Sequence, residues 1–295
     1  MGKHRNTMIS IVTAYYNRKK LFRRTLLSIK HQQVDYSFEV IAVDDGSDDE
    51  ERLEDLVVEF PFLKVIRLEK NNKWYHNSCI PFNIGFKAAK GDKIIIQNPE
   101  CLHFGNILDY TDNHLDEQNY LSFGCFSLDE DITENYEKFS TEYLNKTISE
   151  NSHTIEKDGA LGWYNHSVYR PKAYHFCTAI SKKNLQQLHG FDERFAFGIA
   201  YDDDEFIERV RQKLRVDFVD HVVAFHQNHY HPSSTSYQNR ANIELLYKKN
   251  AFLAKKRNMH LNPTSFSRHL PVSLKKPFLY LELKMESLIR ILQKK

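Results

Sequence analysis

The chain has 295 residues, of which 41% are hydrophobic and 13% aromatic, and its formal net charge is +2. This composition excludes an intrinsically disordered chain and supplies enough apolar residues for at least one domain with its own core. No stretch approaches the roughly 20 apolar residues that a membrane-spanning helix requires.

The first hundred residues alternate between strand-like and helix-like hydrophobic periods. Strands are expected at 8–14, 38–43, 63–68 and 93–97, and helices at 19–33, 48–60 and 78–90. This alternation predicts a mainly parallel sheet with helices on both faces, and ligands of such sheets bind beyond the carboxyl ends of the strands. We expect one cleft to be shared by the polar clusters at those ends, which are Thr13-Ala14, Asp44-Asp45 and Asn98-Pro99-Glu100.

The second half of the chain is less regular. Residues 126–160 are acidic and polar and are expected to form surface loops and a short helix. A strand at 176–181, a helix at 201–214 and an apolar strand at 216–225 follow, and the last strand leads into His226, His229 and His231. Residues from about 240 onward should form helices, which divides the chain into a domain, 1–240, and a basic helical extension, 241–295.

Two clusters carry side chains that suit ligand binding. Asp44 and Asp45 could accept hydrogen bonds from a ribose or a base, or could only form a turn and a helix cap. Glu100 offers the oxygen ligand that Mg²⁺ and Mn²⁺ prefer, although it could also be a solvated strand-end carboxylate. Neutral imidazole binds Mn²⁺ well, so a histidine of the 226–231 group could join Glu100.

Residues 202–205, Asp-Asp-Asp-Glu, place four acidic side chains at the start of the predicted helix 201–214. The helix dipole favours their charged forms, whereas their mutual repulsion raises some of their pKa values. A carboxylate kept ionised beside a bound substrate could act as a general base. The alternative is an acidic helix cap, for which four acids are more than needed.

The order of these motifs resembles the family 2 glycosyltransferases with the GT-A fold. The matching strings are ISIVTAYYNR at 9–18, VDDGSDD at 43–49, FNIGFKAAKGD at 82–92, GFDERF at 190–195 and DDDEFIER at 202–209. The AFHQ stretch at 224–227 is similar to the histidine segment of chondroitin-polymerase-like members. The resemblance covers roughly residues 7–231 and implies an α/β fold with a mostly parallel central sheet flanked by helices.

The resemblance implies an inverting transfer of a sugar from a nucleotide sugar, usually UDP-linked, to a hydroxyl of a glycan or glycoconjugate. Asp203 would be the base that deprotonates the acceptor, and Asp202 would bind or orient the acceptor. Trp163 and Tyr164 could stack on an acceptor sugar, or could be ordinary aromatic core residues. The residues expected to bind the nucleotide sugar are Thr13, Ala14, Tyr15, Asp44, Asp45, Asn83 and Asn98.

A metal-binding D-x-D motif of the family falls on Asn98-Pro99-Glu100, where its first aspartate is replaced by asparagine. Glu100 keeps the charge at the last position, and His226 could supply a second ligand to Mn²⁺ or Mg²⁺. The same departure leaves a second hypothesis open. It is a catalytically weak or inactive sugar-nucleotide or glycan-binding protein built on this fold.

The C-terminal segment is strongly basic. From Tyr247 to the end there are 12 Lys and Arg against 2 Asp and Glu, or +10, so the remaining residues carry −8. Apolar residues recur at helical spacing in 278–293 and could lie on an anionic membrane, or dock on the domain or a second copy. We expect no nucleic-acid partner, because the rest of the chain is acidic and lacks a matching motif.

The four cysteines are scattered without a Cys-x-x-Cys pair, which disfavours a zinc ribbon and indicates reduced thiols. Together with the lack of a spanning segment, this predicts a cytoplasmic protein whose contact with a membrane is at most peripheral.

Overall fold

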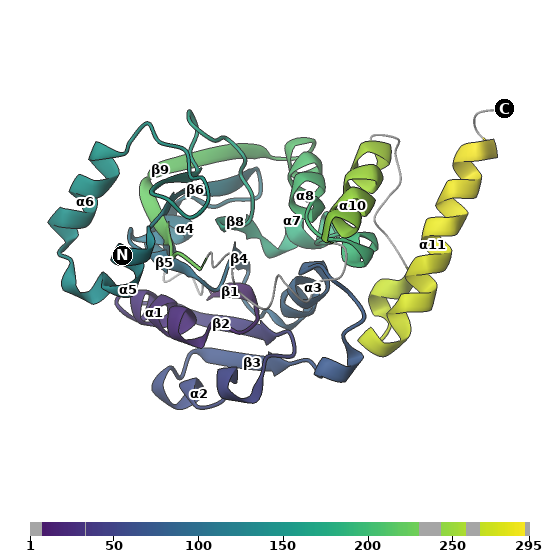
Figure 1. Ribbon diagram of the computed structural model, residues 1–295, viewed down its shortest axis with the longest axis horizontal. Coiled ribbons are helices and arrows are strands. Elements are labelled where there is room, and N and C mark those ends of the chain that lie inside the picture. Colours follow the sequence, from purple (N-terminus) through teal and green to yellow (C-terminus); the bar gives the residue numbers. More distant parts are fainter. Residues whose placement is uncertain (1–7, 33, 230–242, 258–265, 293–295) are drawn as a thin grey trace, which may run out of the picture.

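A nine-stranded mixed sheet forms the centre of the molecule (Figure 1), with the strand order β3-β2-β1-β4-β8-β6-β9-β5 and β7 paired to β6. The structure is a computed structural model, and it describes residues 8–32, 34–229, 243–257 and 266–292. The strands are β1 (Met8–Tyr15), β2 (Ser37–Asp44), β3 (Leu63–Arg67), β4 (Lys93–Gln97), β5 (Cys101–His103), β6 (Asn119–Ser127), β7 (Gly162–Asn165), β8 (Cys177–Ser181) and β9 (Arg215–His226).

Helices cover the two faces and one end of this sheet. The α-helices are α1 (Lys19–Lys30), α2 (Leu56–Glu59), α3 (Cys79–Ala88), α4 (Ile107–His114), α5 (Glu130–Glu134), α6 (Thr141–Glu150), α7 (Lys182–Gln187), α8 (Asp202–Arg211), α10 (Ile243–Arg257) and α11 (Val272–Leu292). Short 3₁₀ turns connect them, namely η1 (Asp49–Glu51), η2 (Lys70–Asn72), η3 (Tyr136–Lys138), η4 (Glu193–Phe197) and η5 (Phe266–His269).

The first four strands of the order, β3, β2, β1 and β4, pair in parallel. The β-branched runs of β1, β2 and β4 are buried on both faces, as expected for a sheet covered by helices, whereas β3 at the edge is partly exposed. Parallel pairing brings Tyr15 beside Asp44, so the carboxyl ends of the strands meet at one edge. The predicted α/β class and this parallel half are confirmed. Beyond β4 the sheet is mixed, because β8 pairs antiparallel with both β4 and β6, whereas β6 and β9 run parallel.

Several elements differ from the expectation, and two of the differences have a clear physical reason. The predicted helix at 48–60 is split into η1 and α2, because the Glu51 carboxylate accepts hydrogen bonds from the Lys19 amide at 2.7 Å and the Tyr15 hydroxyl at 3.1 Å. These bonds hold Glu51 on the neighbouring chain, and Arg52 is extended after it. Strand β6 has no counterpart in the prediction. All nine of its residues are buried, so its sequence lacks the alternation of a half-exposed strand.

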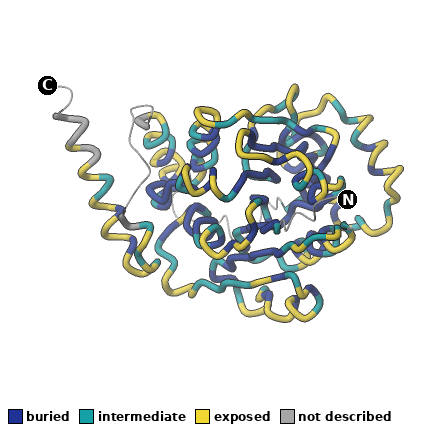
Figure 2. Tube along the Cα trace, turned by 180° about the vertical axis from the view of Figure 1, so that it is seen from behind, coloured by how far each residue is buried: buried dark blue, intermediate teal, exposed yellow. Residues whose placement is uncertain are grey.

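At one end of the molecule α10 packs beside α8 and η4, and α11 packs on η4 and η5 (Figure 1). Helix α11 docks through Leu279 and through Lys275, whose ammonium forms a buried ion pair with Glu193. Part of the predicted apolar stripe faces solvent, because Leu281, Met285 and Leu288 are exposed. Figure 2 shows α11 as one of the most exposed helices. A membrane contact of this stripe stays a prediction. Within the described ranges, no helix has the length and apolar character needed to cross a bilayer.

The tight contact between α3 and the sheet depends on a residue without a side chain. A Cβ atom at Gly85 would collide with Cγ1 of Val12 and would lie 3.2 Å from Cγ2 of Val43. Helix α3 can therefore approach β1 and β2 closely only with glycine at this position. The approach matters for the site because Asn77, just before α3, and Asn83, within α3, donate hydrogen bonds to Asp202 and to the Phe191 carbonyl.

We predict that Gly85→Val lowers the free energy of unfolding by about 1–3 kcal/mol, the usual cost of overpacking a core. Urea denaturation monitored by circular dichroism measures this change. The control is Ala88→Val, an exposed position at the end of the same helix, which should stay within about 0.5 kcal/mol of the parent. Equal stability of the two variants would show that α3 can move away from the sheet at little cost.

Candidate functional site

A buried carboxylate, Glu100, lies between β4 and β5, beside the end of β9. Strand β5 pairs with β9 so that Cys101 is opposite His226, and the Gln227 amide donates to the Glu100 carbonyl at 3.2 Å. This register places the Glu100 side chain against the histidines that follow β9. Its Oε1 lies 3.2 Å from Nε2 of His226 and 3.2 Å from Nε2 of His229, and its Oε2 accepts from Nη1 of Arg18 at 3.0 Å.

The charge state of this corner follows from its partners. Glu100 is only 2% exposed, and burial alone would raise its pKa. The Arg18 guanidinium and the imidazoles of His229 and His226 outweigh burial and hold the pKa of Glu100 well below its usual range. Burial lowers the pKa of His226 more than the Glu100 charge raises it. At neutral pH the corner therefore combines an ionised carboxylate with a neutral His226 ring.

These residues fit a divalent cation. One ligand atom from each of Glu100, His226 and His229 lies within 4.8 Å of the others. A carboxylate with two imidazoles suits Mn²⁺ better than Mg²⁺, which prefers oxygen ligands. Nδ1 of His226 is buried without a hydrogen-bond partner among the described residues. His229 belongs to the predicted histidine group but was not selected as a ligand, and His231 lies outside the described residues.

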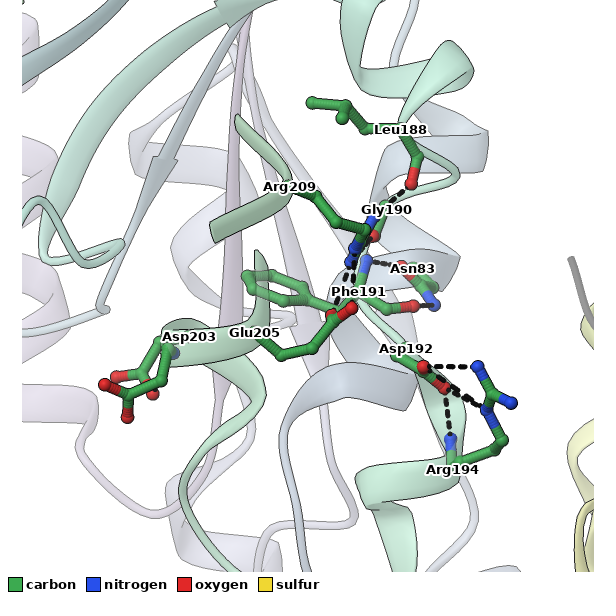
Figure 3. Close-up of polar contacts among 10 residues, drawn as sticks. Asn83, Leu188, Gly190, Phe191, Asp192, Arg194, Asp203, Glu205 and Arg209 are labelled. Carbon is green, nitrogen blue, oxygen red and sulfur yellow. Dashed lines mark hydrogen bonds and ion pairs between the residues drawn. The ribbon is translucent and has the colours of Figure 1, made fainter. Parts of the chain in front are cut away.

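The acidic cluster forms the first turn of α8, as predicted. Oδ1 of Asp202 accepts from Nδ2 of Asn77 at 2.7 Å, while its buried Oδ2 has no partner in the described part of the chain. Asp203 points away from the neighbouring Glu205 (Figure 3). Burial, together with the charges of Asp202 and Asp204, raises the pKa of Asp203 to about 8. Asp203 can thus gain and lose a proton near physiological pH.

The rest of the acidic motif fastens α8 to the chain before it. The Glu205 carboxylate receives two hydrogen bonds from the Arg209 guanidinium, at 2.8 and 2.7 Å, and Arg209 also donates to the carbonyls of Leu188 and Gly190 (Figure 3). Asn83, predicted to bind the nucleotide sugar, instead holds both backbone polar groups of Phe191, at 2.8 and 2.9 Å. In this structure Asn83 is a support of the GFDERF turn.

Residues 174–176, just before β8, lie between the carboxylate corner and the acidic cluster. The Phe176 carbonyl accepts from the Asn98 amide at 3.2 Å, and the Tyr174 hydroxyl donates to Asp204. Burial lowers the pKa of His175, and the charges of Asp202 and Glu100 both act against this shift. One imidazole is therefore within electrostatic range of both acidic groups, as expected if they belong to one site.

Two aromatic residues predicted to contact an acceptor lie on different sides of β7. The Tyr164 ring is half-buried, with its centroid 4.3 Å from that of His226. Trp163 lies in the hydrophobic core against Phe126, and its indole N–H donates to the Ser152 carbonyl at 3.0 Å. The geometry thus keeps Tyr164 as the candidate contact, whereas Trp163 is a core residue that is 4% exposed.

Most side chains predicted to bind the nucleotide have partners within the chain. Asp44 accepts from the Ser47 amide at 2.9 Å and pairs with Arg67 at 2.6 Å, so it shapes the turn after β2. Asp45 pairs with Lys73 at 2.7 Å and remains partly accessible. The Tyr15 hydroxyl donates to the Glu51 carbonyl at 2.7 Å.

Three other predicted residues either have a polar group without a hydrogen-bond partner in the described structure or are partly exposed. The buried Oγ1 of Thr13 has no partner in the ranges that the structure describes, and Ala14 and Asn98 are half-buried. These positions remain candidates for a nucleotide contact. Arg18 and His175 were not singled out from the sequence. Arg18 falls inside the ISIVTAYYNR string, so that motif was the available signal.

Comparison with solved structures supports the fold. A mannosyltransferase from Pyrobaculum calidifontis, solved in complex with GDP-Man and Mn²⁺, superposes with a TM-score of 0.51 at 15% identity, over 94% of this chain and 71% of that chain. At this identity the likeness concerns the fold alone, which is GT-A.

Comparison of sequences identifies the family. A chondroitin synthase from Escherichia coli is 36% identical over 88 residues, which are 30% of this chain and 12% of that protein. A chondroitin synthase from Pasteurella multocida is 26% identical over 249 residues, or 76% of this chain and 25% of that protein. The chain thus spans at most a quarter of the length of these two relatives. The model of glycosyl transferase family 2 matches residues 10–175, more than half of the chain, and the chain therefore belongs to glycosyl transferase family 2.

Proposed function

We propose that the chain is an inverting glycosyltransferase that moves a sugar from a nucleotide sugar to a hydroxyl of a glycan or glycoconjugate. The observation that carries this proposal is that the pKa values of two carboxylates are shifted in opposite directions. Glu100 is held ionised by Arg18 and two histidines, whereas Asp203 has a pKa of about 8. Such a divergence separates a charge-stabilising group from a proton-transfer group in one site.

In the proposed reaction, the acceptor oxygen forms a bond to the anomeric carbon while the bond from that carbon to the diphosphate breaks. Ionised Asp203 receives the acceptor proton, and the nucleoside diphosphate leaves with the bonding electron pair. Asp202, fixed by Asn77, would orient the acceptor, and Tyr164 would contact its ring. Glu100, His226 and His229 would hold Mn²⁺, which when bound neutralises charge on a diphosphate.

The donor is proposed to be a UDP-sugar, on the basis of the family resemblance. The mannosyltransferase with the same fold binds GDP-Man, so a guanine nucleotide is the main alternative. Incubating the chain with Mn²⁺, a panel of UDP-sugars and GDP-mannose, and measuring the released nucleotide by mass spectrometry, separates the two donors.

A second candidate function is a sugar-nucleotide or glycan-binding protein without turnover. Asn98 at the first position of the metal motif favours it, as does the ion pair between Arg18 and Glu100, which occupies one oxygen of the candidate metal ligand. Nucleotide binding without any release of nucleotide across the donor and acceptor panel would support this function.

We predict that Asp203→Asn reduces sugar transfer by about 10²- to 10⁴-fold, the usual contribution of a general base, because an amide cannot take the acceptor proton. Binding of UDP with Mn²⁺, measured by calorimetry, should change less than threefold, about 0.6 kcal/mol. The control is Glu208→Gln, an exposed acid on the same helix, which should retain transfer. Retained transfer in Asp203→Asn would remove this residue from the base role.

The pH dependence follows from the raised pKa of Asp203. Because the base must be ionised, kcat/KM should rise with pH, reach half its maximum near pH 8 and level off above it. Asp204→Asn removes a like charge that raises this pKa, so the midpoint of the rise should move to lower pH. Initial rates between pH 5.5 and 9.5 measure both curves. An unchanged midpoint in Asp204→Asn would contradict this account of the shift.

We predict that Glu100→Gln and His229→Ala each weaken Mn²⁺ binding by at least about tenfold, because each removes a ligand atom. Electron paramagnetic resonance of free Mn²⁺, titrated in the presence of UDP, measures the affinity. His221→Ala, an exposed histidine on β9 outside the corner, is the matched control and should bind Mn²⁺ like the parent. Equal affinities in all four proteins would place the metal elsewhere.

A further inference from the structure

The backbone immediately before α8 is strained. Ala200 and Tyr201 have φ angles of +58° and +66°, although neither is glycine. Non-glycine residues in the left-handed region are strained, and two in succession persist only where the surrounding structure holds them. The next two residues are Asp202 and Asp203. The direction in which these carboxylates leave the helix therefore depends on whatever holds the strained pair.

Helix α10 supplies the contacts that hold this segment. Nδ2 of Asn250 donates to the Ala200 carbonyl at 2.9 Å and to the Phe195 carbonyl at 3.0 Å. One turn earlier, the Leu246 carbonyl accepts from the Ile199 amide at 3.3 Å, and the Tyr247 ring lies 5.0 Å from the ring of Tyr201 between centroids. Residues 246, 247 and 250 lie on one face of the helix. That face contacts residues 195, 199, 200 and 201 through hydrogen bonds and one ring contact.

A glycine allows α10 to come this close. A Cβ atom at Gly198 would collide with Oδ1 of Asn250 and would lie 2.5 Å from the Leu246 carbonyl oxygen. Asn250 itself is 2% exposed, so its amide is committed to these two carbonyls and not to water. Figure 1 shows α10 running beside α8. Both helices follow residues 10–175, the part of the chain that the family model matches.

A second anchor from the extension reaches the same segment from its other end. Lys275 of α11 forms its buried ion pair with Glu193, the first residue of η4, and Glu193 also accepts from Asn83 at 3.2 Å. The stretch 193–201 is thus held at its start by α11 and α3 and at its end by α10.

We propose that Asn250 is a positioning residue for catalysis, through which α10 clamps residues 195–201 and sets the place of Asp202 and Asp203. The proposal rests on the proposed function for its effect on turnover. The C-terminal extension is then part of the catalytic machinery, and not only a surface for a membrane or a partner. An exposed part of the same extension remains available for such a contact.

The test compares Asn250→Asp with Asn184→Asp in the full chain. Both changes are nearly isosteric and replace a buried amide that donates to a backbone carbonyl. The Asn184 amide donates to the carbonyl of Glu117 at 2.9 Å, and that carbonyl does not belong to the 195–201 segment. In Asn250→Asp the side-chain NH₂ group, which donates to two carbonyls, is replaced by a carboxylate oxygen that can only accept. Both hydrogen bonds are lost, so α10 should release the clamped segment. The first readout is hydrogen exchange of the amides in 199–206, which should become at least about tenfold faster in Asn250→Asp and stay unchanged in Asn184→Asp.

The second readout is the split between kcat and KM. In Asn250→Asp, kcat should fall by about 10- to 100-fold, because a small displacement of a catalytic group is costly, while KM for the donor stays within twofold. Gly198→Ala should reproduce both effects from the other side of the contact. Unchanged exchange in 199–206 for both Asn250→Asp and Gly198→Ala would overturn the clamp. So would faster exchange with kcat equal to that of Asn184→Asp.

Failure of the proposed function gives a different result. In that case the parent chain releases no nucleotide from any donor, while the exchange measurement still decides whether α10 holds the segment before α8.

Discussion

A carboxylate that is buried and still charged constrains the whole architecture. Removing such a charge from water is costly unless cations and hydrogen-bond donors surround it. Glu100 meets this requirement with groups from two distant parts of the chain: Arg18 before α1, and His226 and His229 at and just after the end of β9. The segment after β1 and the end of β9, which belong to the parallel and the mixed half of the sheet, must therefore lie next to each other at Glu100. Their register determines whether the corner can hold a metal.

The acidic cluster lies in a different environment, and the pKa of Asp203 is shifted in the opposite direction to that of Glu100. No cation is paired with Asp203 in the described structure, and burial together with its acidic neighbours raises its pKa. Asp202 is fixed by Asn77, and the remainder of the motif, Glu205 and Arg209, is used to hold α8 against the GFDERF turn. A motif that looks uniformly catalytic thus divides into groups that can do chemistry and groups that place them. The contacts of α10 extend this placement beyond the motif.

The local parts of the fold could be predicted from the sequence, and the tertiary parts could not. Strands β1 to β4 and helices α1 and α3 follow hydrophobic periods that neighbouring residues determine, so their positions were predicted closely. Strand β6 was missed because it is buried on both faces. The predicted helix 48–60 is broken because Glu51 has distant partners. Glu100, His226, Asp202 and Asp203 were predicted as site residues from motif order, whereas the support roles of Asp44 and Asn83, the position of Trp163 in the core and the contacts of Asn250 arise only from packing.

The central claim is that the Glu100 corner and the Asp203 cluster serve one bound nucleotide sugar. A crystal structure of the chain with Mn²⁺ and the nucleoside diphosphate, with anomalous diffraction at the manganese edge, tests it most directly. The account predicts an anomalous peak between Glu100, His226 and His229, with the diphosphate bound to that metal and facing Asp203. A metal peak at another location, or a diphosphate bound on a surface remote from Asp203, would contradict it.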